Sequence, residues 1–178
     1  DELIDIKETS GNDDIIIVTK HGKSIRFSEK DVRATGRAAM GVRALKLGEG
    51  DEVISMCLVN EEDKLLVVTQ NGFGKRTPVK DYKKQERGGK GILTYDKSKF
   101  SKTGELVGAV TVEEDDEVLL INSDGIIIRI EAKDVSEFGR ATQGVKIMKV
   151  EEDANIISMT KVSMRQPNAD FGPIRSHS

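Results

Sequence analysis

Apolar positions along the chain occur in short runs and not at helical spacing. The runs "IIIV" (15–18), "LLVV" (65–68) and "VLLI" (118–121) each follow a charged residue and precede a turn that ends in glycine. Short runs rich in β-branched residues and bounded by turn signals are typical of strands. No long segment with a 3.6-residue period is present. The pattern therefore predicts an all-β fold.

These runs belong to a unit that occurs three times, at residues 13–32, 63–82 and 116–135. Each copy reads as an acidic residue, an apolar run, a glycine turn, a short strand with an arginine, and Lys-Asp. The positions that align are Gly22, Gly72 and Gly125; Arg26, Arg76 and Arg129; and Asp31, Asp81 and Asp134. The glycines are expected to supply a positive φ in hairpins. The arginines are expected either to pair with the repeated aspartates as structural contacts or to serve at the surface.

A second glycine turn and a closing strand complete each unit. The turns "GRAAMGV" (36–42), "ERGGKGI" (86–92) and "GRATQGV" (139–145) align and share an arginine and a glycine. The aligned residues are Arg37, Arg87 and Arg140, and Gly41, Gly91 and Gly144. The closing strands are "VISMCLV" (53–59), "LVGAVTV" (106–112) and "IISMTKV" (156–162).

Four short strands in a unit of about 45–50 residues lie in the period range of propeller blades, which must stack to bury both sheet faces. We therefore expect one domain over residues 1–162, with four-stranded blades at 13–59, 60–112 and 113–162. Residues 1–12 contain "LIDIK", which matches the closing strand, and are expected to be the end of a preceding blade. The polar tail, 163–178, is expected to lie outside the fold, as a disordered or partly vector-derived segment.

Basic residues are concentrated in one part of an acidic chain whose net charge is −3. The segment from Lys75 to Lys102 holds ten basic and three acidic residues, a net charge of +7, whereas the remainder carries −10. Such clustering is the footprint of a surface that binds a phosphate backbone, although a run of charge can also be a solvated face. Its position around the glycine-rich "QERGGKG" (85–91) favours the binding surface.

The chemistry-bearing residues do not form an enzyme site. Two histidines and one cysteine, Cys57, provide neither a catalytic triad nor zinc spacing. "GGKG" lacks the Ser/Thr and the following helix of a nucleotide-binding loop. The acidic run "EEDDE" (113–117) is expected to be a solvated linker. The apolar flanks of Cys57 predict a buried thiol, and the composition favours a cytoplasmic protein with no membrane span.

The units with "GR-x-x-x-GV" turns resemble the C-terminal domain of the DNA gyrase A subunit over about residues 1–162. The resemblance implies a β-pinwheel, typically of six blades that exchange strands with their neighbours. The family has a box of the form Gln-basic-Arg-Gly-Gly-basic-Gly, usually in its first blade. The matching residues are Gln85, Arg87, Gly88, Gly89, Lys90 and Gly91, whereas Glu86 is an acid where the family has a base.

The resemblance implies a module that binds and wraps duplex DNA without sequence preference. It would support ATP-dependent negative supercoiling by a bacterial cytoplasmic, nucleoid-associated enzyme that joins two A and two B subunits. The cleaving tyrosine, the metal site and the ATP site belong to other parts of that enzyme, so no cofactor is expected here. The alternatives are the related subunit of topoisomerase IV and a propeller-like protein scaffold without DNA contact.

The side chains expected to contact DNA are those of the box and of the basic segment around it, with the equivalent rim arginines of the other units. They are Gln85, Arg87, Gly88, Gly89, Lys90, Gly91, Lys75, Arg76, Lys80, Lys83, Lys84, Arg37 and Arg140. If the blades surround an axis, Arg37, Arg87 and Arg140 lie at regular intervals on the rim. Such a surface recognises the shape and charge of a curved duplex rather than its bases.

Overall fold

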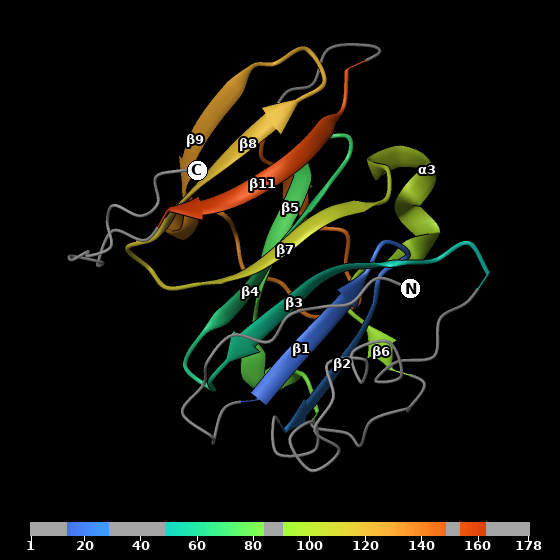
Figure 1. Ribbon diagram of the computed structural model, residues 1–178, viewed down its shortest axis with the longest axis vertical. Coiled ribbons are helices and arrows are strands. Elements are labelled where there is room, and N and C mark those ends of the chain that lie inside the picture. The colour runs from blue at the N-terminus through green and yellow to red at the C-terminus, as the bar shows by residue number, and fades with distance from the viewer. Residues whose placement is uncertain (1–13, 29–48, 84–90, 149–153, 163–178) are drawn as a thin grey trace, which may run out of the picture.

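The computed structural model of the chain describes residues 14–28, 49–83, 91–148 and 154–162. These residues form three antiparallel sheets, one for each sequence unit, connected by turns and short helical segments (Figure 1). Strands β3, β7 and β11, one from each sheet, lie side by side (Figure 1). The all-β prediction is confirmed. No helix in this part of the chain is long and apolar enough to cross a bilayer.

The first two sheets have four strands each, and the third has three among the described residues. The first has the order β3-β1-β2-β6, with β1 (Asp14–Thr19), β2 (Lys23–Ser28), β3 (Val53–Val59) and β6 (Ile92–Leu93). The second has the order β10-β5-β4-β7, with β4 (Lys64–Thr69), β5 (Phe73–Pro78), β7 (Leu106–Val112) and β10 (Val145–Lys146). The third has the order β11-β8-β9, with β8 (Glu117–Asn122), β9 (Ile127–Glu131) and β11 (Ile156–Val162).

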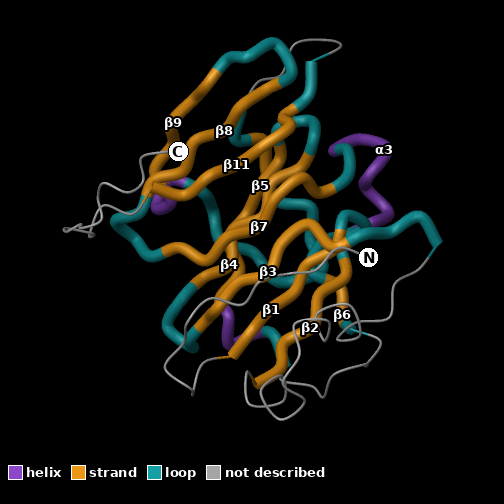
Figure 2. Tube along the Cα trace, viewed as in Figure 1, coloured by secondary structure: helices purple, strands orange, loops and turns teal. Residues whose placement is uncertain are grey.

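Short helical segments connect these strands (Figure 2). They are the 3-10 turns η1 (Val79–Asp81), η2 (Lys97–Lys99) and η3 (Ala132–Asp134), and the single-turn helix α3 (Phe100–Thr103). η1 and η3 directly follow β5 and β9, the equivalent strands of the second and third units. The repeated Lys-Asp pair of the sequence is therefore part of a 3-10 turn in these two units.

Neighbouring sheets exchange a strand, as the resemblance implied. β6 belongs to the second sequence unit but pairs with β2, where Ser24 lies opposite Ile92. In the same way β10, from the third unit, pairs with β5, where Gly74 lies opposite Val145. The sheets therefore differ from the sequence units at one strand, because the fourth strand of each of these two sheets comes from the following unit.

The continuous apolar runs reflect burial on both faces of a strand. In β4, Leu65 and Val67 face the core shared with the first sheet, whereas Leu66 and Val68 face the core shared with the third. Successive side chains of a strand point to opposite faces, so a strand between two packed sheets needs apolar residues at every position. β9 is at the edge of the described structure, and its alternate residues are exposed, Ile127 among them.

The repeated arginines of the first two units are buried contacts between sheets. Arg26 Nε donates to Asp14 Oδ2 at 2.8 Å, and its guanidinium also donates to the carbonyl oxygens of Val79 and Tyr82, in and beside η1. Arg76 Nε donates to the Val135 carbonyl at 2.6 Å, beside η3. Each guanidinium thus fixes the turn of the next unit against its own sheet.

An acidic side chain completes each of these contacts. Glu61 Oε2 lies 3.1 Å from Arg26 Nη2, and Glu114 Oε2 lies 2.9 Å from Arg76 Nη1. A structural role for these arginines, one of the two alternatives, is therefore confirmed. The prediction that Arg76 pairs with the repeated Asp81 is wrong, because its guanidinium instead donates to the Val135 carbonyl and to the linker residue Glu114.

Arg129 is the matched comparison, because it occupies the same position in the third unit but is largely exposed and pairs with Glu117, at 2.7 Å. We expect Arg76→Met to lower the free energy of unfolding by about 2–3 kcal/mol, since it leaves buried carbonyls without donors. Arg129→Met should change it by less than about 1 kcal/mol, as for a surface ion pair. Urea unfolding followed by circular dichroism measures both, and equal losses would contradict the inter-sheet role of Arg76.

Candidate nucleic-acid interface

The structure describes only part of the predicted DNA-binding set. Gln85, Arg87, Gly88, Gly89 and Lys90 of the box lie outside the described residues, as do Lys84 and Arg37. Gly91 ends the box segment and has the positive φ, 80°, that the repeat predicts. It directly precedes β6, so the end of the box segment lies at the outer edge of the first sheet.

Two of the predicted residues, Lys75 and Arg76, are buried in β5 and occupied by contacts within the chain. Lys75 is fully buried, and its Nζ donates to the Gly139 carbonyl at 2.7 Å, to the Arg140 carbonyl and to Thr142 Oγ1 at 3.2 Å. Arg76 is committed to the third unit, as described above. The geometry therefore places both side chains in the packing between sheets and not on a surface that DNA could reach.

Burial determines the electrostatics of Lys75. Desolvation, with a further contribution from the Arg140 guanidinium, lowers the pKa of the Lys75 ammonium from its ordinary value to about 7, whereas Asp96 acts in the opposite direction. The ring of Tyr95 lies 5.6 Å from Nζ and adds a cation–π contact. A lysine in a basic run is usually solvated. The sequence signal for this burial is the repeat alignment, which has isoleucines at the equivalent positions, Ile25 and Ile128.

The turn of the third unit, residues 139–144, packs against β5 and against the segment that follows β6. Gly144 has a φ of 76°, and a Cβ there would lie 2.4 Å from the Gly74 carbonyl oxygen, so only glycine permits this approach. The Asp96 amide donates to the Thr142 carbonyl at 3.1 Å, and the Tyr95 hydroxyl donates to the Gln143 carbonyl. The turn is thus held by both neighbouring segments.

Arg140 lies beside the end of the box segment although it is about 50 residues away in sequence. Its Nη1 donates to the Leu93 carbonyl at 2.8 Å, two residues beyond Gly91. The side chain is half-buried, and its other guanidinium nitrogens have no hydrogen-bond partner among the described residues. Strand exchange therefore brings the rim arginine of the third unit next to β6 of the second, which follows the last box residue, Gly91.

Within the described residues, the exposed lysines of the basic segment fall into two groups at opposite ends of β5. Lys80 and Lys83 follow its last residue, in and just after η1. Lys97, Lys99 and Lys102 belong to η2 and α3, next to the hairpin that precedes its first residue. Asn71 Nδ2 in that hairpin donates to the Lys102 carbonyl at 3.0 Å. At about 3.3 Å per residue, the length of the strand separates the two groups by roughly 17 Å.

Lys146 joins the second group and was missed by the sequence analysis. Its Nζ lies 5.7 Å from the centre of the Phe73 ring, and so does that of Lys102, so one aromatic ring contacts two ammonium groups. Lys146 is in β10 of the third unit, outside the basic run, and only the exchange of β10 into the second sheet brings it here. Lys97, Lys99, Lys102, Arg140 and Lys146 are called the rim cations below.

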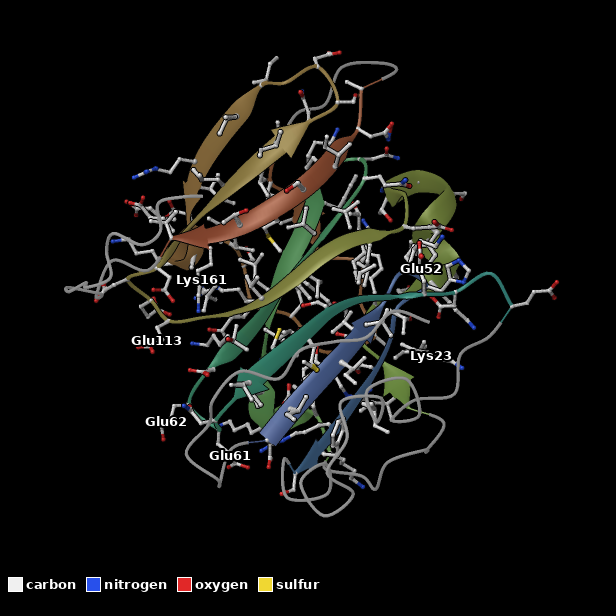
Figure 3. All side chains as sticks on the ribbon, in the orientation of Figure 1. Lys23, Glu52, Glu61, Glu62, Glu113 and Lys161 are labelled. Atoms are coloured by element: carbon white, nitrogen blue, oxygen red, sulfur yellow. The ribbon has the colours of Figure 1, made fainter. Side chains whose placement is uncertain are left out.

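The opposite end of the second sheet is acidic. Figure 3 shows Glu61, Glu62 and Glu113 on the linkers at this edge of the molecule. A cleft of about 490 Å³ lies between the linkers, and its lining residues are Asn60, Glu62, Asp63, Lys64, Val112, Glu113, Glu114 and Asp115. Burial raises the pKa of Asp63, whereas the adjacent Arg76 lowers that of Glu114. No group of acidic, histidine or cysteine side chains suited to a metal ion occurs in the described residues.

A family model for the DNA gyrase C-terminal domain, a beta-propeller, matches the chain three times, over residues 13–60, 63–113 and 116–163. The three matches begin at residues 13, 63 and 116, where the three copies of the sequence unit begin. The chain is 42% identical to the A subunit of DNA gyrase from Staphylococcus epidermidis over 170 residues, which is 94% of this chain and 19% of that protein. It is 43% identical to the corresponding Staphylococcus aureus protein over 164 residues, 91% of this chain and 18% of that protein. The chain thus spans about a fifth of the length of these relatives.

Solved structures of topoisomerase C-terminal domains share the fold. The C-terminal domain of DNA topoisomerase IV superposes with a TM-score of 0.77 at 22% identity, covering 89% of this chain and 49% of that one. The DNA gyrase A C-terminal domain superposes with a TM-score of 0.55 at 24% identity, covering 88% of this chain and 68% of that one. With the family match over most of its length, the chain belongs to the DNA gyrase C-terminal domain family.

Proposed function

We propose that the chain is a module of a DNA gyrase A subunit that binds and wraps duplex DNA without sequence preference. The observation that carries this proposal is the set of rim cations, which strand exchange gathers from two sequence units at one side of the second sheet. Lysine and arginine side chains that face solvent bind the phosphate backbone and impose no base preference.

The distribution of charge favours an approach of DNA from the side of the rim cations. The linkers at the far end of the second sheet carry several carboxylates, Glu61, Glu62 and Glu113 among them (Figure 3). A polyanion is repelled there and attracted at the rim cations. Arg87 and Lys90 of the box and Arg37 of the first unit are proposed to extend this surface, whereas Lys84, the sequence neighbour of Lys83, is not. The buried Lys75 and Arg76 are not proposed as direct contacts.

In the parent protein, this module would present a wrapped segment of DNA to gyrase B and to the rest of the gyrase A protein. The complex of two A and two B subunits would use ATP and Mg²⁺, bound elsewhere, for negative supercoiling in the bacterial cytoplasm. A topoisomerase IV origin is the second candidate, favoured by the TM-score of 0.77. The 42–43% identity to gyrase A proteins favours gyrase, because similarity at 22% identity supports the fold alone.

Duplex binding is expected to fall steeply with salt. If each of the five rim cations meets one phosphate, a plot of log affinity against log salt concentration has a slope of about −4.5, and steeper if the box adds contacts. Fluorescence anisotropy with two labelled duplexes of unrelated sequence, between about 50 and 200 mM salt, measures the slope and the lack of preference. Absence of binding at the lowest salt concentration would favour the scaffold alternative and overturn the proposal.

The two lysine groups provide a charge-matched test of where DNA lies. We expect Lys102→Glu with Lys146→Glu to weaken binding and to reduce the salt slope by about 1.8, the value for two lost phosphate contacts. Lys80→Glu with Lys83→Glu changes the net charge equally, but at the end of β5 where the acidic linkers lie, so it should have the smaller effect. Equal effects would show that affinity follows net charge and that the rim cations are not the interface.

A further inference from the structure

Lys75 is a buried cation at a position that is apolar in the other two units. In the repeat alignment Ile25 and Ile128 occupy the equivalent places in β2 and β9. Removing an ammonium from water is unfavourable unless hydrogen bonds replace its hydration. Isoleucine would satisfy the packing of this sheet, so the lysine must be explained by what its ammonium contacts.

All three hydrogen-bond acceptors of the ammonium lie on one turn of the third unit. They are the carbonyls of Gly139 and Arg140 and the hydroxyl of Thr142. The Thr142 hydroxyl in turn donates to the Gly139 carbonyl at 2.9 Å, which closes the turn on itself. The three donors of an ammonium are therefore matched by three acceptors, and the backbone of Arg140 is one of them.

This turn carries Arg140, the rim cation that contacts Leu93, two residues beyond Gly91. Arg140 is tied to the first sheet by the bond from Nη1 to the Leu93 carbonyl, and the rest of its guanidinium has no hydrogen-bond partner among the described residues. A partly exposed guanidinium beside a fixed backbone is suited to a phosphate contact. The position of Arg140 depends on the turn, and the hydrogen bonds from Lys75 fix the turn.

We propose that Lys75 is a positioning residue for DNA binding, whose buried ammonium fixes the Gly139–Thr142 turn so that Arg140 meets the phosphate backbone. The inference rests on the proposed function and goes beyond it, because it assigns a role to a side chain that DNA does not touch. Lys75 acts through Arg140, and the two side chains come from different sequence units.

Lys75 and Arg140 also interact electrostatically, because both side chains carry positive charge. The Arg140 guanidinium disfavours the ammonium form of Lys75, whose pKa is about 7, while Asp96 favours it and the Tyr95 ring lies against it. A phosphate bound at Arg140 offsets the repulsion and raises the pKa of Lys75, so binding takes up a proton. The affinity of the unmodified chain for DNA is therefore expected to fall as the pH rises from about 6.5 to about 8.5.

A double-mutant cycle tests the positioning role. Lys75→Ile uses the residue that the other units hold at this place, and Arg140→Gln removes the rim cation. Each is expected to weaken duplex binding about fivefold, as for one accessible ion pair. In the double variant the loss should stay near fivefold, because both changes remove the same contact. Independent, multiplied losses would overturn the proposal.

The pH profile separates positioning from a general loss of structure. Lys75→Ile should abolish most of the fall in affinity over this pH range, whereas Lys102→Glu should weaken binding and keep that fall. His21 and His177 are unchanged in every variant, so a difference between the pH profiles comes from the substitution at Lys75. If Lys75→Ile does not fold, Lys75→Gln takes its place. An unchanged profile in the folded variant would contradict the proposal.

A measurement without DNA distinguishes failure of this inference from failure of the proposed function. Amide hydrogen exchange should accelerate in Lys75→Ile at Asp96, whose N–H donates to the Thr142 carbonyl of the turn, and at Ile147, just after the turn, whose N–H donates to the Gly72 carbonyl. Exchange in β8 should stay unchanged. If the unmodified chain binds no duplex, the proposed function fails and the role of Lys75 in DNA binding fails with it, whatever the exchange rates. If the duplex binds but these two amides exchange equally in both proteins, only the positioning role is wrong.

Discussion

The fourth strand of each complete sheet comes from the next unit in sequence, and the rest of the structure depends on this exchange. β6 completes the sheet of β1 and β2, and β10 completes that of β4 and β5. Because these strands are only two residues long, they contribute few backbone hydrogen bonds by themselves. Each of them pairs with the sheet of the preceding unit and so places the end of the turn before it against that sheet. The units are therefore interdependent and cannot be treated as separately folded blades.

Buried cations reinforce the same boundaries. Arg26 and Arg76 each bind carbonyls at the 3-10 turn of the following unit, and Lys75 binds the carbonyls of the turn that leads into β10. A buried cation is stable only where several acceptors surround it, so such contacts require the neighbouring unit to be in place. They favour one register between sheets, in addition to the non-directional burial of apolar side chains in the cores between them.

The candidate DNA surface is a product of this architecture. Lys102 and Lys146 share the Phe73 ring although they belong to different units, and Arg140 lies beside the end of the box segment. The basic run in the sequence, by contrast, is divided in space. Two of its members are buried, Lys80 and Lys83 lie near acidic linkers, and the members on η2 and α3 lie at the hairpin end. Basic residues that are close in the sequence therefore do not form one basic patch on the molecule.

The all-β class, the three units and their turns could be predicted from the order of residues, because short apolar runs and positive-φ glycines depend on local backbone physics. The φ values of Gly22, Gly72, Gly91, Gly125 and Gly144 are all positive, as the repeat predicts. Local backbone physics could not predict which basic side chains remain exposed to a ligand, because their exposure depends on how the sheets pack. Lys75 and Lys102 are equally basic in sequence, yet one is buried under the turn of the next unit and the other is exposed. The reason is that burial depends on contacts between units, which the order of residues along one strand does not specify.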